Sequence, residues 1–360
     1  MPRLTGSIAL PLVAAVLLAA WPATTSAQAP FSVGSVSARP GTAARGALEV
    51  APLGGDPGAS IPVTIVHGAT PGPVLVLVAG VHGMEYTPIL ALQRLAASAD
   101  PRQLRGTLVL VHVANMPSFL GRTVYYSPVD GKNLNRVFPG KATGTLSERI
   151  ADVLTREVIA KATHLVDVHC GDGNEWLRPY TYWMTSGAPE VSRVAREMAL
   201  AFGLEHIVID TERPADPSVS VYLANTALLR GTPALTVESG GLAGTDEASI
   251  VRIERGAAGL LKYLGMRTDG PEPLAHPVWI GPIEVLRSST TGLLHPQLEP
   301  GHTVTKGALV AYVTDFHGTR LEEIRAPFDG EVLYVVATPP INKGEPVGAI
   351  GQRAAPPAPR

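Results

Sequence analysis

Four short polar segments of the sequence carry side chains suited to hydrolysing an amide bond around a metal ion: AGVHGMEYTP, DGKNLNRVFPG, DVHCGD and TVESGG. A catalytic zinc ion takes three protein ligands from histidine and carboxylate groups and keeps a further position for water. His82 and Glu85, three residues apart, can turn to one side of a first helical turn. With His169 as the third ligand, the sequence predicts one zinc ion per chain bound by His82, Glu85 and His169.

Other residues of these segments are candidates for acid–base chemistry and substrate binding. Glu238, between an apolar run and Gly240-Gly241, is the candidate general base that takes a proton from water and returns it to a leaving amine. Taken alone, Glu238 is better interpreted as a helix-capping or structural glutamate, and the presence of the metal motif reverses that order. Arg136 offers two parallel donors to a carboxylate and Asn135 adds a side-chain donor, although both also suit a turn.

Two neighbours of His169 have alternative interpretations. Asp167 lies two residues earlier, so on a strand both side chains point to one face. It either orients His169 as a metal ligand or makes an unrelated hydrogen bond at the strand end. Cys170 points the other way and is expected to be a small buried hydrophobic residue rather than a fourth ligand.

The elements that must position these groups follow an alternating pattern. Apolar, β-branched runs predict strands, and segments with helical periodicity lie between them. The strands are expected at 74–78, 108–113, 165–168, 180–184, 207–209 and 234–237, and the helices at 87–97, 147–161, 190–201 and 246–264. This order predicts an α/β fold with a mainly parallel, mixed sheet and helices on both faces. His82, His169 and Glu238 then follow or end strands at their carboxyl ends, where open α/β sheets bind ligands.

Composition indicates where the protein acts and with what. Residues 1–27 have the pattern of a secretory signal peptide, with Arg3, a short apolar run and small residues at the exit, so we expect export to the periplasm or medium and no stable membrane insertion afterwards. The single cysteine excludes an intrachain disulfide. With 29 basic and 31 acidic residues, the chain has no charge excess for nucleic acid, and a small molecule is the expected partner.

The chain is expected to contain two folded parts. Residues 28–270 form the predicted zinc hydrolase domain, and from about His276 short strand-like runs separated by glycine turns replace the helical pattern. Residues 275–352 are therefore expected to form a small all-β, barrel-sandwich-like domain. The Pro-rich residues 353–360 are expected to be a disordered tail.

The four segments, in this order over about 60–265, resemble the succinylglutamate desuccinylase and aspartoacylase family, a branch of the zinc carboxypeptidase fold. The resemblance implies zinc on His82, Glu85 and His169, a substrate carboxylate held by Asn135 and Arg136, and Glu238 as catalytic base. The family also polarises the scissile carbonyl with an arginine upstream of the Asn-Arg pair, and the nearest candidate here is Arg122, fourteen positions before Arg136. The fourteen-residue gap between Arg122 and Arg136 is longer than the spacing expected from aspartoacylase. The segments DVHCGD and ESGG are more similar to the bacterial deacylase-like branch of the family.

The C-terminal segment is similar to a biotinyl or lipoyl carrier barrel. Where a carrier would have its modified lysine, this chain has Thr319. The resemblance therefore implies a wall or lid for the site rather than a carrier.

The sequence thus favours an exported zinc-dependent deacylase. It would cleave the amide of a small N-acyl amino acid or related carboxylate with metal-activated water and a glutamate general base. Two alternatives remain open: a zinc carboxypeptidase or peptidase acting on short or cell-wall peptides, and an exported binding protein that has lost catalysis. The oligomeric state is not predicted.

Overall fold

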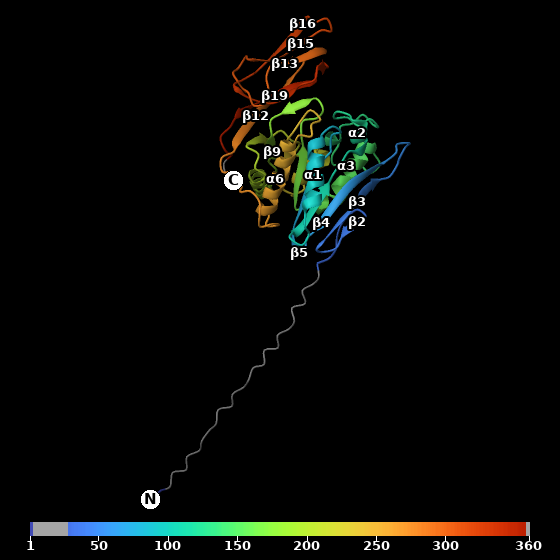
Figure 1. Cartoon of the computed structure of the whole chain (residues 1–360), viewed down its shortest axis with the longest axis vertical. Helices are drawn as coiled ribbons and strands as arrows, with labels where there is room; N and C mark the ends of the chain where they lie inside the picture. The colour runs from blue at the N-terminus through green and yellow to red at the C-terminus, as the bar shows by residue number, and fades with distance from the viewer. Residues whose placement is uncertain (3–27, 358–360) are drawn as a thin grey trace.

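A long mixed β-sheet runs through the molecule and connects its two parts (Figure 1). The computed structural model describes residues 1–2 and 28–357, so the predicted signal peptide falls outside the described residues except for its first two positions. Within the described ranges the sheet has 13 strands in the order β14-β17-β19-β12-β10-β9-β11-β7-β5-β6-β4-β3, with β8 paired to β17. None of the helices in this part of the chain is long and apolar enough to span a bilayer.

The strands of the α/β body are β3 (Thr42–Val50), β4 (Ala59–His67), β5 (Thr70–Val78), β6 (Arg105–Val111), β7 (His164–His169), β9 (Tyr180–Met184), β10 (His206–Asp210) and β11 (Ala234–Glu238). The helices are α1 (Tyr86–Ser98), α2 (Met116–Gly121), α3 (Leu146–Glu157), α4 (Pro189–Phe202), α5 (Leu223–Leu228) and α6 (Glu247–Tyr263). Single 3₁₀ turns occur at η1 (Leu134–Arg136), η2 (Ile159–Lys161) and η3 (Pro217–Val219), and a two-stranded ribbon, β1 (Phe31–Val33) with β2 (Val36–Ala38), precedes β3.

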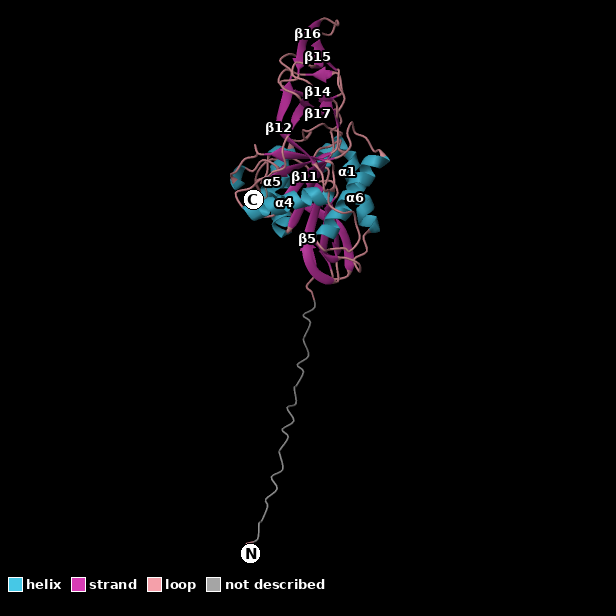
Figure 2. Ribbon diagram, turned by 90° about the vertical axis from the view of Figure 1, so that its left-hand side faces the viewer, coloured by secondary structure: helices cyan, strands magenta, loops and turns pink. Residues whose placement is uncertain are grey.

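The predicted α/β class is confirmed. The central neighbours β6, β5, β7 and β11 pair in parallel, and so do β9 and β10, whereas β9 and β11 are antiparallel. Figure 2 shows helices on both sides of the strands, with α1 and α6 together on one side and α5 on the other. The central strands are fully buried on both faces, which explains their continuous Val and Leu runs.

The C-terminal part is all-β and continues the main sheet. Strand β12 pairs in parallel with β10 of the body and antiparallel with β19, so one strand belongs to both parts. The C-terminal strands are β12 (Val278–Arg287), β13 (Gly292–Pro296), β14 (Thr303–Val304), β15 (Leu309–Thr314), β16 (Arg320–Arg325), β17 (Gly330–Val336), β18 (Pro340–Ile341) and β19 (Pro346–Arg353). A second sheet, β16-β15-β13-β18, completes this part around its own apolar core.

The end of the chain returns to the body. Strand β19 includes Arg353, and the amide of Ala354 donates to the carbonyl of Trp279. The strand thus extends one residue beyond the boundary predicted for the C-terminal domain, and the last three residues of the predicted tail lie outside the described part.

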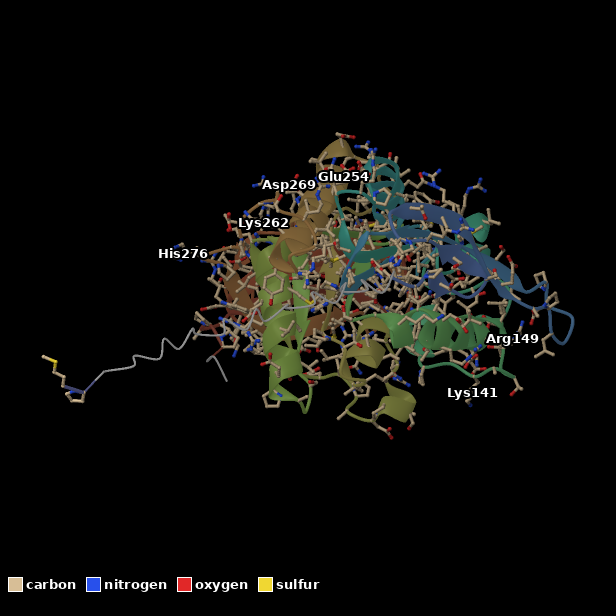
Figure 3. All side chains as sticks on the ribbon, turned by 90° about the horizontal axis from the view of Figure 1, so that it is seen from below. Lys141, Arg149, Glu254, Lys262, Asp269 and His276 are labelled. Atoms are coloured by element: carbon tan, nitrogen blue, oxygen red, sulfur yellow. The ribbon has the colours of Figure 1, made fainter. Side chains whose placement is uncertain are left out.

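The hairpin of β3 and β4 was not predicted from the sequence, where the first expected strand is 74–78. It forms one edge of the sheet, with β4 antiparallel to β6. An ion pair attaches its turn to the body: Arg149 of α3 donates from both terminal nitrogens to Asp56, at 2.9 and 2.7 Å. Figure 3 shows Arg149 at this edge, with Lys262 and His276 toward the opposite side. This edge therefore has a buried charge pair with a structural role.

Candidate active site

Parallel pairing brings the ends of three strands to one place. His82 follows β5, His169 is the last residue of β7 and Glu238 is the last residue of β11. In the ladder His169 lies directly opposite Glu238, and Val78 of β5 lies opposite Asp167 of β7. Residues distant in sequence thus meet at the carboxyl edge of the sheet, as the strand pattern predicts.

The turn after β5 determines where His82 and Glu85 lie. Gly80 has a φ of +68°, and a Cβ there would lie 2.9 Å from the Cα of Val113, so a side chain is excluded by both conformation and space. Glu85 is the N-cap residue of α1 but makes no side-chain cap hydrogen bond. Its carboxylate turns instead toward the two histidines.

His82, Glu85 and His169 form a buried cluster whose ligand atoms all lie within 4.8 Å of one another. His82 Nδ1 lies 2.6 Å from Glu85 Oε1, and His169 Nδ1 lies 2.9 Å from Glu85 Oε2. Glu85 and His169 are each 2% exposed and His82 is 9% exposed. Three convergent ligand atoms of the types zinc prefers, away from bulk water, match a zinc site that retains one position for water.

Two buried carboxylate oxygens depend on His169. Glu85 Oε2 lies 2.9 Å from His169 Nδ1 and Asp167 Oδ1 lies 3.0 Å from His169 Nε2, and neither oxygen accepts a well-aligned hydrogen bond from a described residue. Buried carboxylate oxygens are costly unless a donor or cation faces them. The cluster therefore fits a divalent cation.

The charged groups of the cluster shift one another's pKa values. Burial disfavours the charged form of Glu85, but His169 and His82 outweigh it and lower its pKa to about 2. Burial likewise opposes protonation of His169, while Asp167 and Glu85 raise its pKa well above the usual value. Burial also opposes protonation of His82, and Glu85 raises its pKa. The carboxylates of Glu85 and Asp167 thus favour a positive charge at the position of the two histidine rings.

Asp167 and Asn135 lie behind the cluster. Asp167 Oδ1 is 3.0 Å from His169 Nε2, which leaves Nδ1 of the same ring facing Glu85. This placement favours the interpretation of Asp167 as the residue that orients His169. The Asn135 amide lies 3.2 Å from His169 Nε2, and its oxygen accepts from the Leu223 amide at 2.9 Å. Asn135 therefore has protein partners on both ends of its amide, and its predicted contact with a substrate carboxylate stays a prediction.

Arg136 is exposed and has no carboxylate partner among the described residues. Its Nη1 donates to the Asn135 carbonyl at 2.7 Å, and its guanidinium lies 4.6 Å from the centre of the Tyr222 ring. Arg213, which the sequence did not single out, lies 3.8 Å from the same ring and pairs with Asp210. Arg136 is thus held by one hydrogen bond and one aromatic contact, with its remaining donors free for an anion.

Glu238 has no hydrogen-bond donor among the residues that the structure describes. Burial raises the pKa of its carboxyl well above the usual value, and Glu85 and Glu175 add to this, while His169 opposes it. A carboxylate with a raised pKa beside the metal cluster is suited to take up a proton and return it. Cys170 is buried, and the three-residue cluster does not include it, in line with the expectation of a small apolar residue.

Sequence reasoning missed an acidic group beside His82. Tyr125, with a φ of +59°, donates from its hydroxyl to Glu175 at 2.6 Å and from its amide to Asp172 at 3.0 Å. Its ring stands edge-on to His82, with the centroids 5.8 Å apart. Burial raises the pKa of both Asp172 and Glu175. The signal was present in the sequence, because Asp172 is the last residue of the DVHCGD segment and Glu175 follows it three positions later.

The C-terminal part contacts this acidic group directly. Strand β8 (Glu175–Leu177) pairs with β17, which places Glu175 opposite Val336, and the Asn174 carbonyl accepts from the Ala337 amide. The C-terminal sheet thus supports one side of the site, as expected for a wall.

Arg122 ends α2 in a left-handed conformation, with a φ of +51°. Its segment packs against Gly83, since a Cβ at that glycine would lie 2.6 Å from the Thr123 carbonyl. The Arg122 side chain is exposed and has no hydrogen bond or ion pair with any described residue. Its backbone is therefore near His82, and its predicted contact with the scissile carbonyl stays a prediction.

Comparison with known proteins identifies the family. The model of the succinylglutamate desuccinylase/aspartoacylase catalytic domain matches residues 71–264, a range that contains every predicted site residue. The chain belongs to the succinylglutamate desuccinylase/aspartoacylase family.

Members of this family match most of the chain, including the C-terminal part. The chain is 31% identical, over 81% of its own length and 85% of the relative's, to an N-alpha-acetyl-L-2,4-diaminobutyric acid deacetylase of Halomonas elongata. It resembles a succinylglutamate desuccinylase/aspartoacylase of Rhodobacter sphaeroides, with a TM-score of 0.76 and 25% identity over 87% of this chain and 96% of that one. The product-bound ectoine utilization protein EutE (DoeB) of Ruegeria pomeroyi gives a TM-score of 0.77 at 26% identity, covering 90% and 98%.

Membership of the succinylglutamate desuccinylase/aspartoacylase family assigns the chemistry in general terms. The chain is a hydrolase of the deacylase class acting on amide bonds. The body and the C-terminal β part together form the fold of this family.

Proposed function

We propose that this protein is an exported zinc-dependent deacylase that removes the acyl group from the amine of a small amino acid. The observation that carries the proposal is the buried cluster of His82, Glu85 and His169, with Glu238 directly opposite His169 in the sheet. Family membership supports amide hydrolysis by this arrangement.

The cation and the base would have separate tasks. Bound by His82, Glu85 and His169, a zinc ion would act as a Lewis acid on the scissile carbonyl and lower the pKa of a water molecule. Glu238 would remove a proton from the attacking water and deliver it to the leaving amine. Its raised pKa suits the second step, because a carboxyl group that protonates easily can also donate the proton back.

Arg136 would orient the substrate. Its free donors suit a substrate carboxylate bound in a two-pronged manner, and stacking on Tyr222 fixes the plane of the guanidinium. Such positioning lowers the barrier because the amide is held at the metal and base before reaction. Arg122 would add a donor to the developing oxyanion if its exposed side chain turns toward the amide.

The acidic group beside His82 indicates which amino acid. Asp172 and Glu175 are paired with neither a lysine nor an arginine among the described residues. Burial raises the pKa of both carboxyl groups. A substrate ammonium group would supply the missing cation. The relative from Halomonas elongata is named for N-alpha-acetyl-L-2,4-diaminobutyric acid, which carries a second amino group. We therefore propose an N-acyl diamino acid as the substrate class.

Export is proposed from the sequence of residues 1–27, with cleavage after Ala27. N-terminal sequencing of the protein purified from the cell envelope fraction tests it. A mature chain beginning at residue 28 is expected, and an intact Met1 in a cytosolic fraction would contradict export.

A substrate panel tests the activity. Release of free amine is measured from Nα-acetyl-diaminobutyrate, N-acetylornithine, N-acetylaspartate and a short peptide, with wild type and Glu238→Gln. We expect wild type to cleave the two diamino compounds fastest and Glu238→Gln to be nearly inactive on all of them. Cleavage of the peptide alone would replace this proposal with a peptidase, and turnover of the panel that does not depend on Glu238 would refute the mechanism.

A further inference from the structure

A cavity lined by none of the active-site residues lies on the side of the body formed by α4, β10 and α6. It measures about 430 Å³ and is lined by three arginines, Arg178, Arg252 and Arg255. None of the residues predicted for catalysis lines it. We propose that this cavity binds a small organic anion, a carboxylate or phosphate with an apolar body.

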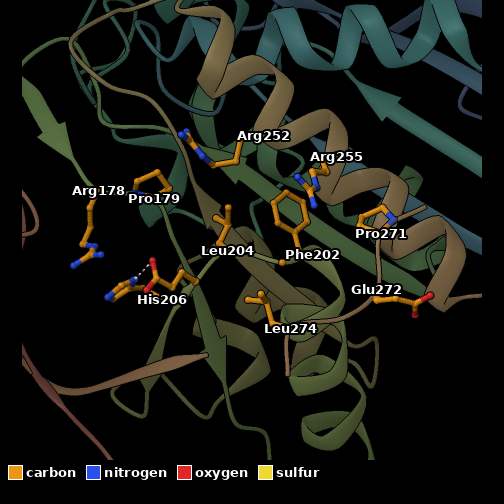
Figure 4. A pocket seen from close by; sticks show the side chains of 12 residues that line it. Arg178, Pro179, Phe202, Leu204, His206, Arg252, Arg255, Pro271, Glu272 and Leu274 are labelled. Carbon is orange, nitrogen blue, oxygen red and sulfur yellow. Dashed lines mark ion pairs between the residues drawn. The ribbon is translucent and has the colours of Figure 1, made fainter. Parts of the chain in front are cut away.

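Two of the arginines are available to an anion. Arg252 and Arg255 are three residues apart on α6, so they project from one face of the helix. Figure 4 shows both on the cavity side of this helix. Neither forms an ion pair within the described chain, and Arg252 is held by the hydroxyls of Ser239 and Ser249, at 3.1 and 3.2 Å. Hydroxyl groups orient a guanidinium without neutralising it.

Nearby carboxylates do not balance this charge. Glu272 is paired with Lys262, and its side chain is 80% exposed. The side chain of Glu205 is 70% exposed and lies 3.9 Å from a His206 nitrogen. Both acidic groups are thus at the solvent edge, where water screens them.

The third arginine is only partly neutralised. Arg178 donates to Glu331 at 2.6 Å, but Glu331 is shared with Arg353 and His206. The Nε of Arg178 is buried and has no hydrogen-bond partner in the described chain. Burial and the proximity of Arg178 lower the pKa of His206, so the environment of this histidine favours its neutral form. The cavity thus keeps an excess of positive charge and an unsatisfied donor.

The remainder of the lining is apolar. Phe202, Leu204 and Leu274 lie below Arg252 and Arg255 in Figure 4, and Pro179 and Pro271 stand at either side. Ligand sites of small molecules combine such an apolar floor with a few convergent polar groups and have volumes of about 300–1,000 Å³. An inorganic anion would not contact these apolar side chains, so the cavity suits an organic anion with an apolar body.

The cavity also contacts the active site through one residue. Ser239, which accepts from Arg252, directly follows Glu238, and its amide donates to the His169 carbonyl. The proposal does not depend on the deacylase activity, because it concerns binding at residues that the reaction does not use.

Calorimetric titration of the mature, zinc-loaded protein with phenyl phosphate, benzoate and inorganic phosphate tests the proposal. We expect saturable binding that depends on the cavity arginines, with phenyl phosphate bound more tightly than inorganic phosphate because its ring covers the apolar floor. Whichever of phenyl phosphate and benzoate binds more tightly shows whether the cavity prefers a phosphate or a carboxylate head group. Arg252→Gln combined with Arg255→Gln should weaken binding at least about tenfold, since each arginine contributes charge-assisted hydrogen bonds.

Matched variants show whether the anion binds in this cavity. Arg255→Gln alone should weaken binding without affecting folding, because Arg255 is exposed and has no partner to lose in the described chain. Arg193→Gln, which removes an α4 arginine paired with Glu190 and Glu197, should leave binding unchanged. Arg136→Gln should also bind normally. Loss of binding in Arg136→Gln, unchanged binding in Arg255→Gln, or no saturable binding of any of the three anions would overturn the proposal.

Discussion

Carboxylates at the strand ends and carboxylates at the hairpin edge have opposite surroundings. Asp56, at the hairpin edge, is held by both terminal nitrogens of Arg149, which lowers its pKa to about 2. Glu238 and Glu175, at the strand ends, have no arginine or lysine partner in the described chain, and burial raises the pKa of both. The chain supplies its own cation where a charge supports the fold. Where charge is unpaired, the cation is expected to come from a metal ion or a substrate.

The largest expected effect comes from removing a ligand at the strand ends. His169→Ala should abolish zinc binding and lower kcat/KM at least about 1,000-fold, because the remaining histidine and carboxylate no longer complete a zinc site. Zinc content and amine release measure it. His164→Ala, at the other end of the same strand, is the matched control and should keep both the zinc content and the rate of amine release. Equal zinc content in the two variants would place the metal elsewhere.

Removing the base should separate catalysis from metal binding. Glu238→Gln should keep the zinc and lower kcat by about 100- to 10,000-fold, the range of general base catalysis. In wild type the rate should fall as the pH drops through the raised pKa of Glu238, because only the ionised carboxylate accepts a proton. The acid limb of the kcat profile should therefore lie above the pH at which an ordinary glutamate titrates. A limb at the ordinary position would contradict the burial argument.

Loss of the proposed substrate anchor should act mainly on binding. Arg136→Gln should raise KM about 10- to 100-fold, because charge-assisted hydrogen bonds to a carboxylate are lost. Steady-state kinetics with the best substrate of the panel, compared with the exposed Lys141→Gln, give the result. A change in kcat with KM unaltered would assign Arg136 to the transition state instead.

At the hairpin edge, the same kind of change should affect stability alone. Arg149→Gln should lower the melting temperature by about 2–6 °C and leave kcat unchanged. Because the folded-state pKa of Asp56 is lowered from 3.8 to about 2, the stabilisation by the pair is present above pH 4 and is lost as the pH falls toward 2. The difference between the melting temperatures of variant and wild type should shrink over that range. A constant difference would mean that Arg149 stabilises the fold through the hydrogen bonds that it donates to the Gly144 and Ala51 carbonyls.

Most of the site follows from the sequence because its residues are tied to strand ends. Continuous apolar runs reveal strands that are buried on both faces, and the residue after each run must lie at the carboxyl edge. His82, His169 and Glu238 were located in this way, and the ladder aligns the last two. Glu85, the third member of the cluster, was located by its separation of three residues from His82, which fits one turn of helix.

The parts that were missed depend on long-range packing. The edge strand β3 has mostly exposed or half-buried positions and no long apolar run, and Pro62 and Thr64 interrupt the apolar residues of β4, so the hairpin was missed. Tyr125 and Glu175 are joined through a left-handed backbone and a strand pairing with the C-terminal part, neither of which has a periodic signature. Arg213 meets Arg136 only across the Tyr222 ring, from a loop without regular structure.

The central claim is that hydrolysis requires a metal ion held by His82, Glu85 and His169. The most direct test is to strip the purified protein with a chelator and titrate zinc back while recording amine release. Activity should vanish on stripping and return in proportion to zinc, reaching its maximum at one ion per chain in wild type, with no return in His169→Ala. Full activity of the stripped protein, or recovery in His169→Ala, would contradict the claim.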